Sequence, residues 1–380
     1  MKRLLALDGG GIRGIFTLEV LARMEALLRA KTGRPALVLA DYFDYIAGTS
    51  TGGIIATCLS WGMPVAEIED LYIRRGMDIF RPAPWYKRWR SKYAAEAITA
   101  MLKEVFAEDA AGQVPALLGT RKLRTLLCLV MRNYSTGSPW PISNNPAAKF
   151  NDPASPECNL RIPLWQLVRA STAAPTFFPP ETIVLGGRQH VFVDGGITPY
   201  NNPSLLLYLM ATMPCFHLEW ERGLDKLLLV SIGTGRVRVT SGTATAGEMS
   251  LLFHARRVPV ALIDSSSLQQ DLLCRILGQC RVGDEIDCEI GDLKDGGAGA
   301  NPGLVPDQAS GEASGQGSGK ASGNNFTYLR YNLLFTPEQH VRAQQFASTG
   351  FAIDNLKLIP LLRDLGAAYA AETVRAEDLL

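Results

Sequence analysis

The sequence predicts an α/β fold in which a mostly parallel central sheet is flanked by helices. Two strand–turn–helix units occur early in the chain, the first starting at Lys2 and the second at Tyr45. Apolar runs at 123–131 and 226–232 predict further buried strands, and 163–173 between them has helical spacing. Strands that alternate with helices in this way are typical of a parallel sheet covered on both faces.

The first unit ends in a glycine-rich turn, DGGGIRG at 8–14. This turn has the G-x-G-x-x-G spacing of a dinucleotide-binding fingerprint, but Asp8 would place a carboxylate against the pyrophosphate. The alternative is an oxyanion hole, in which Gly10 and Gly11 present backbone N–H groups with no side chain in the way. A Walker-type phosphate loop is excluded because no Gly-Lys-Ser/Thr follows.

A nucleophile elbow is predicted at the second turn, where Gly48, Ser50 and Gly52 have the Gly-x-Ser-x-Gly spacing. The glycines let two backbone segments pass closely at a strained corner, which presents Ser50 to a substrate. Ser50 is also expected at the N-terminus of the next helix, whose free N–H groups and dipole favour an oxyanion. Taken alone, the pentapeptide also fits an ordinary Gly/Ser turn.

A base for this serine is less evident from the pattern. The chain has four histidines without an obvious catalytic setting: His190, His217, His254 and His340. The predicted strand around His190, however, runs directly into Asp194, which is followed by two glycines. An acid at a strand end, next to a backbone that can swing close to a neighbour, is a candidate base for Ser50.

Together these segments resemble the patatin-like phospholipase family. The matching segments follow in the family's order: DGGGIRG at 8–14, DYFDYIAGTSTGG at 41–53, RASTAAPTFFPP at 169–180, DGG at 194–196, NNPSLL at 201–206 and LLVSIGTG at 228–235. The resemblance implies a three-layer patatin-like fold and lipid acyl hydrolysis through a Ser50–Asp194 dyad and an acyl-enzyme. It also implies an oxyanion hole at Gly9 to Gly11, with Arg13 on the family's basic position.

The chemistry agrees with this resemblance. An ordinary aspartate, with a pKa near ~3.9, is a weak base for a serine hydroxyl, so the developing charge must be strongly stabilised. The glycine turn and the elbow helix are placed to do this. Ester hydrolysis also depends less on protonation of the leaving group by a general acid than amide hydrolysis does, because an ester releases an alkoxide and an amide must release an amine.

Composition narrows the remaining possibilities. A chain of 380 residues with 47% hydrophobic content can bury a large core, and a net charge of +1 gives no overall attraction to nucleic acid. Seven cysteines without a Cys-x-x-Cys pair indicate a reduced compartment and no metal site. No cofactor, secretion signal or membrane-spanning run is expected. We expect a cytoplasmic protein that acts peripherally at the inner face of the cell membrane.

The segment 80–93 interleaves aromatic and basic residues without an acid. Such a pattern suits the headgroup layer of an anionic bilayer. The candidate membrane contacts are Trp85, Lys87, Arg88, Trp89 and Arg90. A partly buried insertion near the active site is the alternative.

The sequence divides into a predicted catalytic core at 1–240 and an extension at 241–380 packed on that core. Within the extension we expect a helix at 248–277, a strand at 285–290 and a Gly/Ser-rich, unordered loop at 294–325. In the core, 139–156 is expected to be a long polar loop.

Two stretches of the extension, FHARRVP at 253–259 and SSSLQQD at 265–271, resemble bacterial patatin-like effectors of cyclic-oligonucleotide antiphage signalling. On this basis a cyclic dinucleotide such as cyclic GMP-AMP is expected to activate the enzyme, in an antiviral role and with a homo-oligomeric active state. Candidate ligands of its phosphates are Arg236, Arg238, Arg256 and Arg257. Simple solvation of these arginines is the alternative.

Two other functions are weighed against the lipid hydrolase. A Ser-His-Asp triad would use Ser50, Asp194 and one of the later histidines, but an α/β-hydrolase builds several strands before its elbow and this chain builds about two. A dinucleotide-binding module is disfavoured by Asp8.

Overall fold

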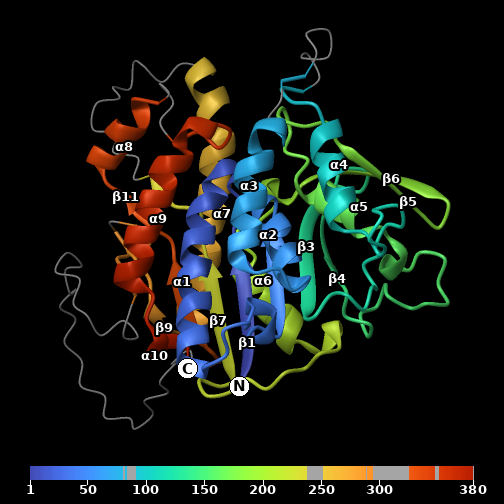
Figure 1. The fold of residues 1–380 in the computed structure, drawn as a ribbon, viewed down its shortest axis with the longest axis horizontal. Helices are drawn as coiled ribbons and strands as arrows, with labels where there is room; N and C mark the ends of the chain where they lie inside the picture. Colours follow the sequence, from blue (N-terminus) through green and yellow to red (C-terminus); the bar gives the residue numbers. More distant parts are fainter. Residues whose placement is uncertain are drawn as a thin grey trace, which may run out of the picture.

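A nine-stranded, mostly parallel sheet runs through the middle of the protein (Figure 1). The computed structural model describes residues 1–79, 82–83, 91–237, 251–287, 289–293, 325–346 and 351–379, with the side chains of 77, 78, 251–257 and 259 left out. Over these residues the strand order is β5-β6-β3-β2-β1-β7-β10-β9, and β4 pairs with β3. The strands are β1 Lys2–Leu7, β2 Tyr45–Thr49, β3 Leu126–Asn133, β4 Ser138–Ser143, β5 Glu181–Leu185, β6 Arg188–Asp194, β7 Leu227–Ile232, β9 Gln279–Val282 and β10 Thr327–Tyr331.

The six strands from β3 to β9 in this order are parallel, and β4, β5 and β6 add an antiparallel margin. A separate pair is formed by β8 (Arg236–Val237) and β11 (Leu334–Phe335). Because the parallel strands share a direction, the loops after β1, β2 and β7 meet at one edge of the sheet. This edge, at the top of Figure 1, carries both predicted glycine turns.

Helices cover both faces of the sheet. They are α1 Gly14–Thr32, α2 Thr51–Ser60, α3 Val65–Ile79, α4 Glu96–Val105, α5 Leu164–Ser171, α6 Ser204–Thr212, α7 Leu251–Leu277, α8 Pro337–Gln344, α9 Ile359–Thr373 and α10 Ala376–Leu379. The layer that includes α1, α2 and α9 covers one face, and α6 and α7 cover the other. None of the described helices has the length and apolar character needed to cross a bilayer.

The alternation of side chains along β1 explains the two layers. Leu5 and Leu7 belong to the core beneath α1 and α2, whereas Leu4 and Ala6 belong to the core beneath α6. Successive residues of a strand point to opposite faces, so a strand that is apolar throughout is buried on both. The continuous apolar run therefore predicted a central strand correctly. The predicted α/β class, with a mostly parallel sheet between helices, is confirmed.

Two local predictions are wrong. The expected loop at 139–156 begins with β4, an edge strand whose Pro139 and Pro141 lie opposite β3, and prolines are tolerated at such an edge. The expected strand at 285–290 does not form in the described part of that segment. There, Asp287 Oδ1 accepts the N–H groups of Glu289 and Ile290 at 3.0 and 2.7 Å, which makes a turn. The insertion at 294–324 lies outside the described residues.

Candidate active site

The elbow forms where the sequence placed it. Ser50 stands between β2 and α2 with φ 55° and ψ −123°, a strained conformation for a residue with a side chain. A Cβ on Gly48 would lie 2.1 Å from the Gly52 carbonyl oxygen, and one on Gly52 would lie 2.3 Å from the Leu7 carbonyl oxygen. Both glycines are therefore required by close backbone contacts, and the second one packs the elbow against the end of β1.

Strand pairing brings Asp194 to this serine. Strand β2 pairs with β3 up to Thr49 opposite Val130, and β6 pairs with the next residue of β3, Met131, through Asp194. The carboxylate therefore lies just beyond the end of β2. Ser50 Oγ donates to Asp194 Oδ2 at 2.6 Å.

The Asp194 carboxylate is held and its basicity is increased. Its Oδ1 accepts the N–H of Gly196 at 2.7 Å, and the side chain is buried. Burial raises the pKa of Asp194 to about 6, although the hydrogen bonds from Ser50 and Gly196 and the charge of Arg169 oppose this. At neutral pH the group is still mostly ionised, but it binds a proton more readily than an ordinary aspartate.

The glycine turn lies beside the serine. A Cβ on Gly9 would be 3.2 Å from Ser50 Cβ. The Gly9 N–H is not free, because it donates to the Asn201 carbonyl oxygen at 3.1 Å. The N–H groups of Gly10 and Gly11 have no hydrogen-bond partner among the described residues, so these two, and not Gly9, are the available donors.

An apolar pocket opens at Ser50. Its walls come from α2, α3, α4 and the loops after β1 and α5, and Gly11 lies on its edge. The large apolar side chains that line it are Ile12, Ile54, Ile79, Ile98, Phe177, Phe178 and Ile353. A fatty acyl chain is the kind of group that such a surface binds, with its ester at the mouth beside the serine.

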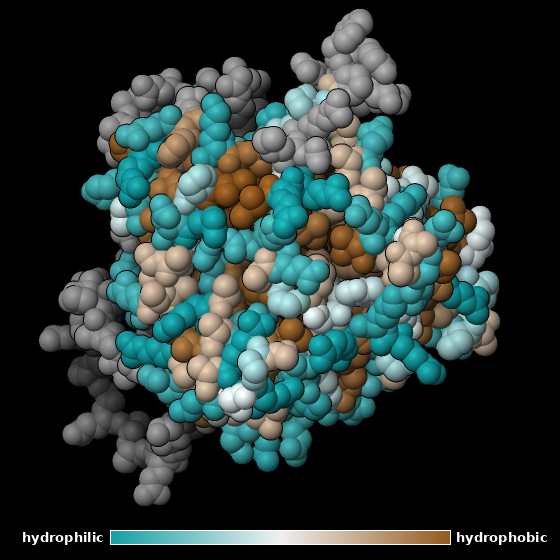
Figure 2. Space-filling view, viewed as in Figure 1, coloured by the Kyte–Doolittle hydropathy of each residue, from teal (hydrophilic) through white to brown (hydrophobic). Residues whose placement is uncertain are grey.

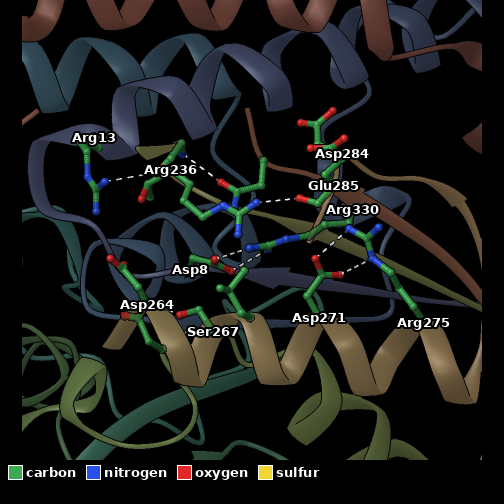
Figure 3. A pocket seen from close by; sticks show the side chains of 16 residues that line it. Asp8, Arg13, Arg236, Asp264, Ser267, Asp271, Arg275, Asp284, Glu285 and Arg330 are labelled. Atoms are coloured by element: carbon green, nitrogen blue, oxygen red, sulfur yellow. Dashed lines mark hydrogen bonds and ion pairs between the residues drawn. The ribbon is translucent and has the colours of Figure 1, made fainter. Parts of the chain in front are cut away.

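Arg13 does not reach this pocket. Its guanidinium donates to the Gly235 carbonyl oxygen at 3.2 Å and lines a separate polar pocket behind the glycine turn (Figure 3). The backbone N–H of Arg13 donates to the Gly10 carbonyl oxygen at 3.3 Å, so it is not a free donor for an oxyanion. The Arg13 side chain points away from Ser50 because its guanidinium bonds the Gly235 carbonyl oxygen, in the turn between β7 and β8.

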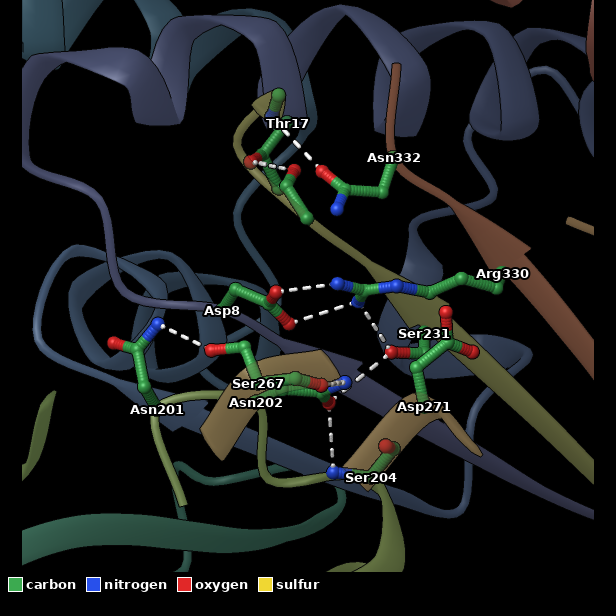
Figure 4. Close-up of polar contacts among 12 residues, drawn as sticks. Asp8, Thr17, Asn201, Asn202, Ser204, Ser231, Ser267, Asp271, Arg330 and Asn332 are labelled. Carbon is green, nitrogen blue, oxygen red and sulfur yellow. Dashed lines mark hydrogen bonds and ion pairs between the residues drawn. The ribbon is translucent and has the colours of Figure 1, made fainter. Parts of the chain in front are cut away.

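Asp8 is engaged by an arginine of β10. Arg330 donates to both carboxylate oxygens at 2.9 and 2.6 Å, and to Ser231 Oγ at 2.7 Å (Figure 4). Both charged side chains are buried. The carboxylate that argued against a pyrophosphate at this turn is thus a structural anchor for the start of the turn.

The three histidines whose side chains are described take no part in the contact between Ser50 and Asp194. His190 lies beside Asn133 at 3.3 Å, His340 is 6.1 Å from the Phe351 ring, and His217 ends a 3-10 turn. The His254 side chain is outside the described residues. Because Ser50 bonds Asp194 directly, no imidazole stands between them as a triad would require.

The remaining candidate residues have mixed outcomes. Arg236 lines the polar pocket, and its guanidinium donates to the carbonyl oxygens of Glu285, at 2.6 Å, and Ile286. The other residues proposed for membrane or nucleotide contact lie outside the described residues or side chains: Trp85, Lys87, Arg88, Trp89, Arg90, Arg238, Arg256 and Arg257. Within the described residues no group of three or more His, Cys, Asp or Glu side chains is arranged to hold a metal ion.

Two residues near the serine were not singled out from the sequence. Ser171 Oγ accepts the backbone N–H of Ser50 at 3.0 Å. Arg169, fully buried two residues earlier on α5, lowers the pKa of Asp194 through its charge, against the larger effect of burial. Both lie in the RASTAAPTFFPP segment, which carried part of the family resemblance. Arg169 and Ser171 could have been noticed in the sequence as polar residues in the predicted helix at 163–173.

Comparison with known proteins identifies the family of the chain. A cGAMP-activated phospholipase from Vibrio cholerae is 34% identical over 210 residues, which cover 54% of this chain and 56% of that protein. Patatin-17 of Solanum cardiophyllum is 31% identical over 65% of this chain and 64% of its own length, and Patatin-1-Kuras 2 of Solanum tuberosum is 29% identical over 65% and 66%. The matched region thus spans between half and two thirds of these relatives. The model of the patatin-like phospholipase family matches residues 5–208, and the chain belongs to that family.

Proposed function

We propose that the protein is a lipid acyl hydrolase with Ser50 as nucleophile and Asp194 as base. The observation that carries this proposal is the 2.6 Å contact between Ser50 Oγ and Asp194 Oδ2 at the mouth of an apolar pocket. The raised pKa of Asp194 supports its role as a base.

In the first half of the reaction Ser50 Oγ attacks the ester carbonyl carbon while Asp194 takes the hydroxyl proton. The negative charge on the carbonyl oxygen is stabilised by the N–H groups of Gly10 and Gly11 and by the N-terminus of α2. Asp194 then gives its proton to the departing alcohol, which leaves an acyl-Ser50 ester. In the second half Asp194 takes a proton from water, the hydroxide attacks the acyl carbon, and the fatty acid leaves as Ser50 regains its proton.

Membrane phospholipids are the substrate class that fits best. The pocket offers mostly apolar walls to the acyl chain, and hydrophobic side chains gather on the upper half of the face in Figure 2, near the carboxyl edge of the sheet. The protein would act peripherally at the cytoplasmic face of the cell membrane, and the aromatic and basic segment 80–93 would make the contact.

Release of fatty acid from vesicles tests the activity. Vesicles of phosphatidylethanolamine and phosphatidylglycerol are incubated with the protein and with Ser50→Ala, and the products are identified by mass spectrometry. We expect free fatty acid and lysophospholipid with the wild-type chain only. Equal release by a folded Ser50→Ala variant would refute the proposed nucleophile.

Membrane contact is tested separately. Reversing the charge of Lys87, Arg88 and Arg90 is expected to weaken binding to anionic vesicles, more at low than at high salt, and to leave hydrolysis of a soluble short-chain ester unchanged. Equal losses on vesicles and on the soluble ester would show that the segment is structural.

Activation by a cyclic dinucleotide is proposed as the control of this activity. The support is that a relative from Vibrio cholerae is a cGAMP-activated phospholipase and that four arginines follow β7 in the sequence of this chain. The bound state would be the active one and homo-oligomeric. Hydrolysis measured across a panel of cyclic nucleotides, with light scattering for assembly, tests this. High basal activity that no nucleotide raises would remove the proposed control and leave the hydrolase.

A further inference from the structure

A second pocket lies behind the glycine turn, on the opposite side from the apolar one. Its lining is polar and comes from the loops after β1, β7 and β9 and from β8, β10 and α7. The side chains of Arg13, Arg236 and Asp264 point into it (Figure 3). Its volume is about 40 Å³. That is room for about three water molecules, or for one phosphate group.

The charges around this pocket are only partly paired. Asp8 is paired with Arg330, and Asp271 accepts two hydrogen bonds from Arg275 at 2.9 and 2.8 Å. In contrast, Arg13 and Arg236 bond only to backbone carbonyl oxygens among the described residues, and the Nε atom of each is buried without a partner. Two guanidinium groups that have no carboxylate within ion-pair distance among the described residues therefore face one small space, and the nearby Asp264 acts on the charge of both.

A carboxylate completes the arrangement. Asp264, on α7, faces the same space and makes no ion pair or hydrogen bond with any described residue. A simple anion would be repelled by it, whereas a ligand that joins a phosphate to N–H or O–H donors matches both charges. A nucleotide is such a ligand, because its phosphate suits two guanidinium groups and its base or ribose can donate to the carboxylate.

We propose that this pocket binds a nucleotide through Arg13, Arg236 and Asp264 and that the bound nucleotide sets the position of the glycine turn. The proposal rests on the proposed nucleotide control of the hydrolase and gives it a site. The phosphate would lie between the two arginines, and Asp264 would accept a donor of the base or ribose.

One route from the pocket to the active site runs through Arg13 itself. Its guanidinium lines the pocket, while its backbone N–H donates to the Gly10 carbonyl oxygen at 3.3 Å. A phosphate that moves the side chain therefore moves the residue that holds Gly10. The N–H of Gly10 is one of the two free donors beside Ser50.

A second route starts on α7. Asn201 Nδ2 donates to Ser267 Oγ at 3.0 Å, and the Asn201 carbonyl oxygen accepts the Gly9 N–H (Figure 4). Asn201 is also packed tightly on the turn, because a Cβ on Gly9 would lie 2.5 Å from Asn201 Oδ1. Ser267 stands one helical turn after Asp264 on the same helix. If a ligand displaces α7, Ser267 moves with it, and Asn201, which bonds both Ser267 and Gly9, transmits the movement to the glycine turn.

The size of the pocket means that it must widen to admit a nucleotide. A phosphate group fits the space of about 40 Å³, but a base and a ribose do not. A nucleotide that enters fully must therefore widen the pocket, and one of its walls is α7, which carries Asp264 and Ser267. Binding and the position of the turn are coupled for this reason.

The location is tested by calorimetric titration of the full chain with cyclic GMP-AMP, inorganic phosphate and glycerophosphoethanolamine, the last as the source of a lipid headgroup phosphate. We expect cyclic GMP-AMP to bind most tightly. Asp264→Asn and Arg236→Gln should each weaken it at least tenfold, and Arg121→Gln, at an exposed position away from the pocket, should not. If glycerophosphoethanolamine binds more tightly than cyclic GMP-AMP, the pocket is a site for lipid headgroups and the proposal of a nucleotide site is wrong.

The route through α7 is tested by comparing two neighbouring serines. Ser266 Oγ and Ser267 Oγ both donate to the Ile263 carbonyl oxygen, at 2.9 and 3.0 Å, but only Ser267 also accepts from Asn201. Ser267→Ala is expected to lower the ratio of stimulated to basal ester hydrolysis, measured at saturating cyclic GMP-AMP, about fivefold or more. Ser266→Ala is expected to keep the wild-type ratio, and equal behaviour of the two variants would overturn the route.

The outcomes separate this proposal from the proposed control. If cyclic GMP-AMP activates the wild-type chain but neither Asp264→Asn nor Arg236→Gln weakens its binding, the pocket is wrong and the control stands. If cyclic GMP-AMP neither binds nor activates, the proposed control by this nucleotide is wrong. The pocket is then tested with linear nucleotides by thermal shift, and no binding that depends on Asp264 or Arg236 would overturn it.

Discussion

Ser171 Oγ accepts the backbone N–H of Ser50 at 3.0 Å and donates to the Val130 carbonyl oxygen at 2.6 Å. The nucleophile is thus tied through one hydroxyl group to the end of β3, the strand that also pairs with Asp194. The positions of Ser50 and Asp194 are therefore both fixed by contacts with β3. This common support holds the 2.6 Å contact between them although Ser50 has a strained backbone.

The first prediction concerns the contact itself. Ser50→Ala and Asp194→Asn are each expected to lower kcat on a soluble ester about a thousandfold or more, and the double variant to be scarcely worse than either. Two groups that act on one proton lose their whole effect when either is removed. Asp225→Asn, an exposed change, serves as the control, and independent, multiplying losses in the double variant would contradict the dyad.

The second prediction concerns pH. Because the pKa of Asp194 is raised to about 6, kcat/KM for a soluble ester is expected to rise with pH through about 6 and then level off. The base must be deprotonated to accept the serine proton. A midpoint near 4 would show that Asp194 is an ordinary aspartate in the free enzyme.

The same shift predicts how stability depends on pH. A carboxyl pKa raised from 3.8 to about 6 stabilises the folded state below pH 3.8, and this contribution, about 3 kcal/mol, is lost as pH rises through 6. We expect Asp194→Asn to raise the free energy of unfolding, relative to the wild type, more at pH 8 than at pH 4. Urea unfolding at the two pH values measures this, and a difference that is the same at both would contradict it.

The third prediction concerns the packing of the glycine turn. A Cβ on Gly10 would lie 2.2 Å from Thr234 Oγ1, so Gly10→Ala is expected to displace the turn and to lower kcat by about a hundredfold or more. All three of the nearest atoms belong to the Thr234 side chain. Adding Thr234→Gly should therefore restore much of the activity, and no recovery in a folded double variant would show that another contact is responsible.

The fourth prediction concerns the apolar pocket. Ile98 is buried on α4 and lines the pocket with Ser50, so Ile98→Phe is expected to shorten the space for an acyl chain. Turnover of a long-chain ester should fall at least about tenfold relative to a butyrate ester. Val184→Phe adds a ring at an exposed position of β5 and controls for stability, and equal losses on both esters would place the acyl chain elsewhere.

The fifth prediction concerns the ion pair under the glycine turn. Arg330→Met leaves the Asp8 carboxylate buried and unpaired, which is expected to cost about 3–5 kcal/mol of unfolding free energy. Asp8→Asn combined with Arg330→Met should cost less than Arg330→Met alone, since the charge is gone. Additive losses in urea unfolding would show that the two side chains stabilise the fold independently.

Some features were predictable because their physical cause is local. The strand at 2–7, the glycine turn after it and the elbow at Ser50 depend on apolar runs and on glycines where backbones touch, and all three formed as predicted. The structure also has a capping box at the start of α8, with Thr336 and Gln339, and its cause is equally local. The failed strand at 285–290 had a suitable alternation, but nothing local shows whether a partner strand is available.

The sequence by itself determined the α/β class, the elbow serine, the glycine turn and the family, because each depends on residues close together in the chain. The tertiary structure decided which of these groups meet. Asp194 reaches Ser50 through the pairing of β6 with β3, Arg330 reaches Asp8 across the sheet from β10, and Arg13 turns away from the serine into the polar pocket. Such contacts depend on strand order and register, which are set by burial of the whole sheet between its helices and not by any local pattern.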